Sequence, residues 1–131
     1  MKYYFSKILE NTGFEETKEK VIESLKKEGF GVLTQIDIKA TLKKKLDVNF
    51  RPYEILGACN PPFAYKALLA EDKIGTMLPC NVILQEKEDG NIEVSAVNPS
   101  VSMIAIKNDN LADIANEIQQ KLQKVIESLA V

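Results

Sequence analysis

The chain has 131 residues, of which 45% are hydrophobic and 27% charged, and we expect residues 1–131 to form a single domain with its own core. A net charge of −2 at pH 7 gives no electrostatic reason to expect nucleic acid or an anionic membrane as a partner, and no apolar run reaches the length of a membrane span. The first residues lack the apolar stretch of a signal peptide, and two cysteines are too few for a disulfide framework, so we expect a cytoplasmic protein with reduced thiols.

The first elements expected are a strand and an amphipathic helix. Residues 3–9 are aromatic and aliphatic and predict a strand. One helical face of the next segment is apolar, at Phe14, Val21, Ile22 and Leu25. Thr12 and Glu15 have the spacing of a capping box, and Gly29 is expected to end the helix.

A strand over 31–37 and a lysine-rich helix over 38–46 are expected next. This region contains the chain's main basic cluster, formed by Lys39, Lys43, Lys44, Lys45 and Arg51. No aromatic residue lies among those lysines to stack on nucleic-acid bases. We therefore interpret the cluster as a solvated surface rather than a nucleic-acid interface.

The middle of the chain predicts two strands that flank a helix. Residues 52–59 are mostly apolar, which is typical of a strand inside a sheet. Asn60 is a favourable helix cap, and Pro61 suits the first helical position, so we expect a helix to Ala70. Residues 80–86 predict the fourth strand.

The remaining elements complete the expected fold. Asp89-Gly90 predicts a hairpin that leads to a fifth strand over 92–97. A final amphipathic helix, with Asn110 as its cap, is indicated by apolar residues at helical spacing: Leu111, Ile114, Ala115, Ile118, Leu122, Val125, Ile126 and Leu129. The order predicts an α+β fold: a single antiparallel sheet with helices on one face, in the order strand, helix, four strands, helix, and with extra short helices.

The two cysteines are the most informative residues for function. The chain has no histidine, the commonest general base and metal ligand, so thiol chemistry would fall to Cys59 and Cys80. If the segment between them returns antiparallel, the two cysteines lie at the same end of adjacent strands; a parallel crossover would place them at opposite ends. The following hairpin favours the antiparallel return.

Several interpretations of these thiols remain open. A helix that begins after Cys59 favours its thiolate, although Pro61 and Pro62 provide no N–H groups there. Both cysteines are alternatively small buried hydrophobic residues. Two thiols without histidine make an incomplete zinc site, so we expect no metal and no cofactor; a four-thiolate site across a dimer is the remaining metal alternative.

The segment Phe50-Arg51-Pro52-Tyr53-Glu54-Ile55-Leu56-Gly57-Ala58-Cys59-Asn60-Pro61-Pro62, followed by Ile74-Gly75-Thr76-Met77-Leu78-Pro79-Cys80-Asn81-Val82, resembles the domain of unknown function 302 family. The resemblance extends over nearly the whole chain. It implies a fold similar to a single copy of the TATA-box-binding-protein arrangement, and a homodimer. Members also occur fused to redox and sulfur-handling domains, which points to thiol or sulfur chemistry. The family often has histidine where this chain has Tyr65.

We therefore hypothesise a site that binds a small ligand or carries a thiol or sulfur redox change. Cys59 is the expected nucleophile or acceptor and Cys80 the second thiol. The expected ligand-binding residues are Asn60, Asn81, Arg51 and Tyr65. Expected partners are a second copy of the chain and a small-molecule or sulfur-carrier partner, without nucleic acid or membrane. The alternative is a structural or protein-interaction dimer whose cysteines only pack in the core.

Overall fold

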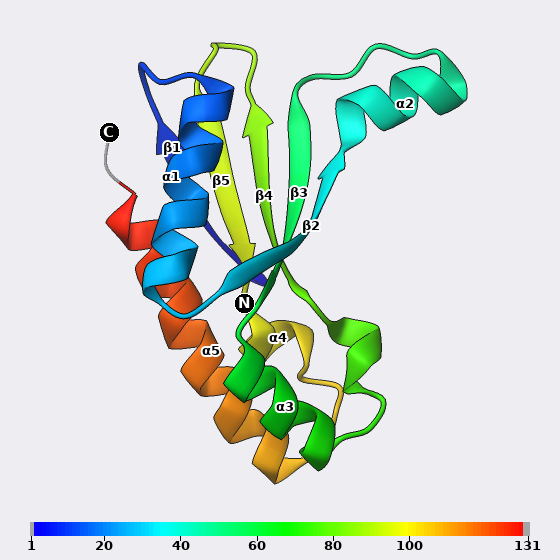
Figure 1. The fold of residues 1–131 in the computed structure, drawn as a ribbon, viewed down its shortest axis with the longest axis vertical. Coiled ribbons are helices and arrows are strands. Elements are labelled where there is room, and N and C mark those ends of the chain that lie inside the picture. Colours follow the sequence, from blue (N-terminus) through cyan, green and yellow to red (C-terminus); the bar gives the residue numbers. More distant parts are fainter. Residues whose placement is uncertain (1, 130–131) are drawn as a thin grey trace.

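The computed structural model describes residues 2–129, which form one five-stranded antiparallel sheet with helices (Figure 1). The strands are β1 (Tyr4–Leu9), β2 (Gly31–Asp37), β3 (Tyr53–Cys59), β4 (Cys80–Glu86) and β5 (Ile92–Val97), in the spatial order β1-β5-β4-β3-β2. The helical elements are α1 (Phe14–Lys27), α2 (Ile38–Leu46), α3 (Pro61–Ala70), the 3₁₀ turn η1 (Ile74–Met77), α4 (Pro99–Ser102) and α5 (Asp109–Ser128). The predicted α+β fold and its element order are confirmed.

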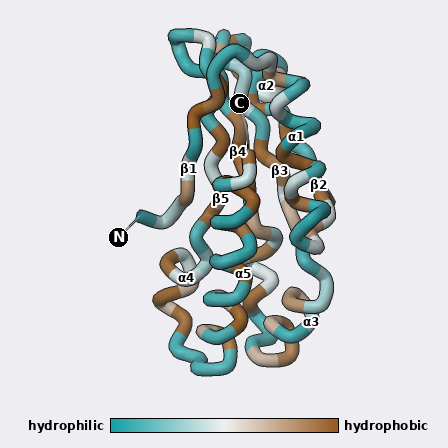
Figure 2. The backbone as a smooth tube through the Cα atoms, turned by 90° about the vertical axis from the view of Figure 1, so that its left-hand side faces the viewer, coloured by the Kyte–Doolittle hydropathy of each residue, from teal (hydrophilic) through white to brown (hydrophobic). Residues whose placement is uncertain are grey.

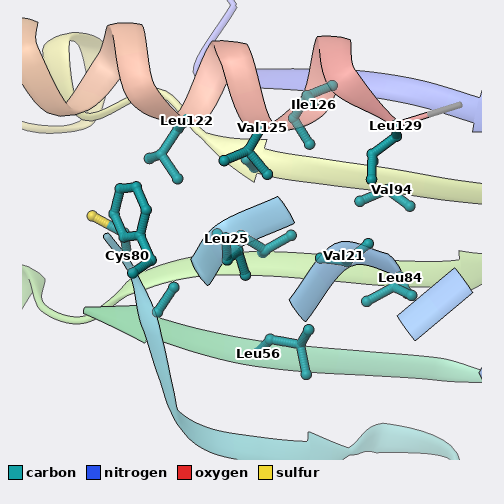
Figure 3. Packing of buried hydrophobic residues seen from close by; sticks show 14 of the residues in the cluster. Val21, Leu25, Leu56, Cys80, Leu84, Val94, Leu122, Val125, Ile126 and Leu129 are labelled. Atoms are coloured by element: carbon teal, nitrogen blue, oxygen red, sulfur yellow. The ribbon is translucent and has the colours of Figure 1, made fainter. Parts of the chain in front are cut away.

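Helices α1 and α5 pack on one face of the sheet. Side chains alternate between the two faces of a strand, so Val82 and Leu84 of β4 point into this layer and are fully buried. Figure 3 shows Val21 and Leu25 of α1, and Leu122 and Val125 of α5, directed toward the strands. The apolar stripe of the C-terminal helix is therefore core, and Figure 2 shows hydrophobic residues recurring along α5.

The sheet pairing confirms the antiparallel return between β3 and β4. Ala58 pairs with Cys80, and Tyr53 at the other end of β3 pairs with Gln85. The hairpin between β4 and β5 is confirmed too, and Gly90 has a φ of 86°, in the left-handed region that glycine adopts without strain. As expected, β3 lies inside the sheet, between β4 and β2.

Two predicted helix caps are wrong. At α1 the N-cap is Gly13, because the Thr12 hydroxyl donates to the Glu16 carboxylate at 2.9 Å instead of capping the helix. At α5 the N-cap is Asn108, whose side-chain oxygen accepts hydrogen bonds from the N–H groups of Asn110 and Leu111. The helix-ending role of Gly29 is confirmed: its φ is 85°, which permits the αL turn that ends α1.

Sequence analysis missed α4, since four residues are too short to show helical periodicity. The helix begins after Asn98, whose side-chain oxygen accepts from the Ser100 N–H at 3.1 Å. This short helix matters for function because Pro99 and Met103 at its two ends line the cavity described below.

The other face of the sheet is more open. Ile8 and Ile36 lie on it and are 51% and 44% exposed. A hollow of about 430 Å³ on this face is lined mainly by aromatic and polar residues: Tyr3, Tyr4, Tyr53, Asn81, Ile83, Gln85, Glu93, Ser95, Ala96 and Val97. Helix α2 extends away from the body of the domain and has no buried residue, so its lysines face solvent as expected (Figure 1).

Candidate functional site

An apolar cavity lies where β3 ends and β4 begins. Its volume is about 280 Å³, and helices α3, α4 and α5 complete its wall. The lining residues are Phe30, Leu33, Ala58, Cys59, Asn60, Phe63, Ala64, Ala67, Leu68, Leu78, Pro79, Cys80, Pro99, Met103, Leu111, Ile114, Ala115 and Ile118. Among the lining residues, which all belong to the described range 2–129, Asn60 is the one polar side chain besides the two cysteines, and none is charged.

Both cysteines line this cavity and neither forms a disulfide. The pairing of Ala58 with Cys80 places Cys59 one residue beyond the direct partner of Cys80, so the two cysteines lie at the same end of adjacent strands, as predicted. Alternation along β3 gives the Cys59 side chain a different direction from those of Ala58 and Cys80, and both cysteines still belong to the lining because the cavity lies where β3 ends. The strand geometry therefore does not align the two Cβ–Sγ bonds for a disulfide.

The environments of the two thiols differ. Cys59 is half-buried, whereas Cys80 is 8% exposed. Burial, and to a smaller extent the charge of a Cys59 thiolate, raises the pKa of the Cys80 thiol to about 11. At neutral pH Cys80 is thus a protonated thiol, and Cys59 is the more accessible nucleophile of the pair.

Asn60 occupies the N-cap position of α3, as predicted, but its side chain does not cap the helix. A capping side chain usually accepts from the second or third helical N–H, and Pro62 at the second position has none. The Asn60 Nδ2 instead donates to the Glu28 carbonyl oxygen at 3.1 Å, next to Gly29. The side-chain oxygen of this 93% buried residue accepts no hydrogen bond from any residue between 2 and 129.

Pro79 forms part of the cavity wall and packs against Gly57 of β3. A Cβ atom at Gly57 would lie 2.8 Å from Pro79 Cγ and closer still to Thr34 Oγ1. The Thr34 hydroxyl can rotate away, but the proline ring cannot. Gly57 is therefore required for the close approach of β3 to the segment that leads into Cys80.

We expect Gly57→Ala to lower the free energy of unfolding by about 1–3 kcal/mol, because the added methyl group overpacks the contact with Pro79. Urea unfolding measures the change. The matched control is Gly75→Ala, since nothing lies within 4 Å of a Cβ there. A Gly57→Ala protein as stable as Gly75→Ala would contradict this account of the wall.

Three of the predicted ligand-binding residues lie outside the cavity. Asn81 is exposed and lines the hollow on the open face, because it alternates with Cys80 along β4. Arg51 precedes the opposite end of β3, where its Nε donates to Gln85 Oε1 at 2.9 Å and its guanidinium stacks on Phe50. Tyr65 is 66% exposed on α3. The structure thus brings together Cys59, Asn60 and Cys80 but not the other three.

Much of the cavity lining was not predicted as part of a site. Ile114, Ala115 and Ile118 were correctly placed on the apolar stripe of the last helix, but their spacing does not distinguish a core from a cavity wall. Met103 follows the missed helix α4. Phe30 directly follows Gly29, and no motif marks it.

Residues 2–129 contain neither a candidate metal site nor a helix suited to cross a membrane. Within residues 2–129, no group of three or more His, Cys, Asp or Glu side chains is arranged to hold a metal ion. Over the same residues, no helix has both the length and the apolar character that crossing a membrane requires.

Comparisons with known proteins place this geometry in context. The family model described as "Domain of unknown function DUF302" matches residues 5–129. The crystal structure of an uncharacterized conserved DUF302 protein from Bacillus stearothermophilus is similar, with a TM-score of 0.89 and 30% sequence identity over 97% of this chain and 98% of that one. No curated protein matches significantly.

Proposed function

Since the chain belongs to the DUF302 family, a domain of unknown function, we propose its function from its own cavity: it binds a small, mostly apolar ligand there and uses the Cys59 thiol on that ligand. The observation that supports this is that both cysteines belong to the lining of one cavity, whose other lining residues are apolar except for Asn60. Ligand sites typically combine an apolar wall with a few placed polar groups. A volume of about 280 Å³ suits a small molecule, given that a dry cavity of about 150 Å³ accepts benzene.

In this proposal Cys59 is the nucleophile or the acceptor of a sulfur or redox change. It is half-buried at the end of β3 and belongs to the cavity lining. Cys80 is the second thiol, held protonated by burial. The partner is a small molecule or a sulfur carrier: a persulfide donor would transfer its outer sulfur to the Cys59 thiolate, forming a Cys59 persulfide as the donor's S–S bond breaks and the donor leaves as a thiolate.

Filling the cavity tests the binding proposal. Ala64 of α3 lines the cavity, so we expect Ala64→Leu to weaken binding of 4-methylphenol at least tenfold. Stability should stay equal or rise, because the added carbons fill empty space. The measurement is a titration of ¹⁵N-labelled protein followed by amide chemical shifts.

The matched control is Ala40→Leu on α2, an exposed helical alanine far from the cavity lining. It should bind 4-methylphenol as the wild type does. Equal affinity of all three proteins, or no binding to the wild type, would contradict the proposed site and favour the alternative of a structural or protein-interaction module.

We also propose that the chain works as a cytoplasmic homodimer. The open sheet face supports pairing, since Ile8 and Ile36 expose apolar surface there and Tyr4, Tyr53 and Ile83 are only half-buried. Sedimentation equilibrium gives the mass directly. A monomer at all concentrations up to the millimolar range would end this part of the proposal and leave the cavity proposal untouched.

A further inference from the structure

We propose that Asn60 is the polar anchor of the cavity, and that the ligand is an uncharged molecule with an apolar body and one hydrogen-bond donor, such as a hydroxyl or N–H group. This inference rests on the proposed binding function, for which it defines the chemical class of the ligand. It depends on the placement of a single amide group.

The orientation of that amide is fixed by its neighbour. The Glu28 carbonyl oxygen is an acceptor, so the Asn60 amide nitrogen must face it, at 3.1 Å. The side-chain oxygen then points away from that contact. Glycine at position 29 leaves room for this arrangement. A Cβ atom there would lie only 3.1 Å from Asn60 Nδ2.

The oxygen is left available by the local sequence. The second helical residue, Pro62, has no N–H to donate, and no side-chain cap forms. Among residues 2–129, every fully enclosed side-chain nitrogen or oxygen has a hydrogen-bond partner. The Asn60 oxygen has none, so it remains in contact with open space, and the cavity is the space that Asn60 lines.

The Asn60 oxygen and the other lining residues together define which chemical class of ligand the cavity favours. An acceptor oxygen favours a donor, and a buried acceptor without a partner penalises a ligand that offers none. No lysine or arginine belongs to the lining, so a carboxylate or phosphate would enter without a cationic partner. The cavity therefore favours a neutral donor over both an apolar isostere and an anion.

The test compares three probes of similar shape on the wild-type protein: 4-methylphenol, 4-fluorotoluene and 4-methylbenzoate. The fluorine of 4-fluorotoluene replaces the hydroxyl without donating a hydrogen bond. We expect 4-methylphenol to bind at least fivefold more tightly than 4-fluorotoluene, and 4-methylbenzoate not to bind. In a cavity without an anchor the order would reverse, because 4-fluorotoluene is the more apolar probe.

The second part of the test repeats the probe comparison on the Asn60→Leu variant. This substitution keeps a similar volume but removes the acceptor, so 4-fluorotoluene should become the tighter ligand. Because the wild-type order needs no variant, a misfolded Asn60→Leu protein leaves the test intact. If 4-fluorotoluene binds the wild type as tightly as 4-methylphenol, the anchor is wrong while the cavity proposal stands. If no probe binds, the proposed function itself fails.

Discussion

In the folded protein at pH 7.5, iodoacetamide is expected to alkylate Cys59 at least about a hundredfold faster than Cys80. Cys59 is half-buried, whereas Cys80 is 8% exposed. With its pKa raised to about 11, roughly one Cys80 thiol in three thousand is ionised at this pH. The low exposure of Cys80 and its small ionised fraction therefore both slow its alkylation. Peptide mass spectrometry reads each site separately over time.

Two controls accompany this experiment. In urea both cysteines should react at similar rates, because the unfolded chain removes the difference in environment. In Cys59→Ser, Cys80 should stay protected, which shows that its protection does not come from modification of Cys59. If Cys59 reacts only after unfolding, both cysteines are packing residues, and the thiol part of the proposed function is wrong.

The second large effect is a loss of stability at alkaline pH that depends on Cys80. Its pKa is raised from an ordinary value of about 9 to about 11, so the native state retains a proton that the unfolded state loses. The contribution to the free energy of unfolding is therefore fully present below about pH 9. Above that pH the free energy of unfolding falls by about 1.4 kcal/mol per pH unit, and the total loss is about 3 kcal/mol near pH 11.

Urea unfolding at intervals between pH 7 and 10.5, with a reductant present, measures this dependence. Cys80→Ala provides the comparison, because it removes the Cys80 thiol and leaves every other ionisable residue in place. The stability difference between the two proteins should shrink as pH rises. Parallel curves over the whole range would show that the Cys80 thiol ionises equally in the folded and unfolded chains.

Sequence reasoning succeeded where short-range rules are decisive. Runs of apolar, aromatic and β-branched residues identified the strands, and the 3.6-residue period identified α5, because both patterns are local consequences of burying these elements in a core. The Asp89-Gly90 turn made the neighbouring strands antiparallel, which correctly placed Cys59 and Cys80 at the same end of the sheet. Cap positions at Thr12 and Asn110 failed because several nearby polar residues compete for the same N–H groups.

The composition of the site was predicted less well, for geometric reasons. Asn81 follows Cys80 directly, yet strand alternation sends the two side chains to opposite faces. Arg51 precedes β3 and Cys59 ends it, so roughly 26 Å of extended chain separates them at about 3.3 Å per residue. Closeness in the sequence was a poor guide to closeness in space for both residues.

The sequence by itself determined the order of the strands and longer helices and the loss of a capping N–H at Pro62, and the Asp89-Gly90 turn favoured the antiparallel return, since each rests on patterns that are local in the chain. Only the tertiary structure decided that Glu28 holds the Asn60 amide, that burial keeps Cys80 protonated, and that three helices enclose a cavity at the strand ends. Those features depend on contacts between segments far apart in the chain, which local periodicity and propensity do not specify.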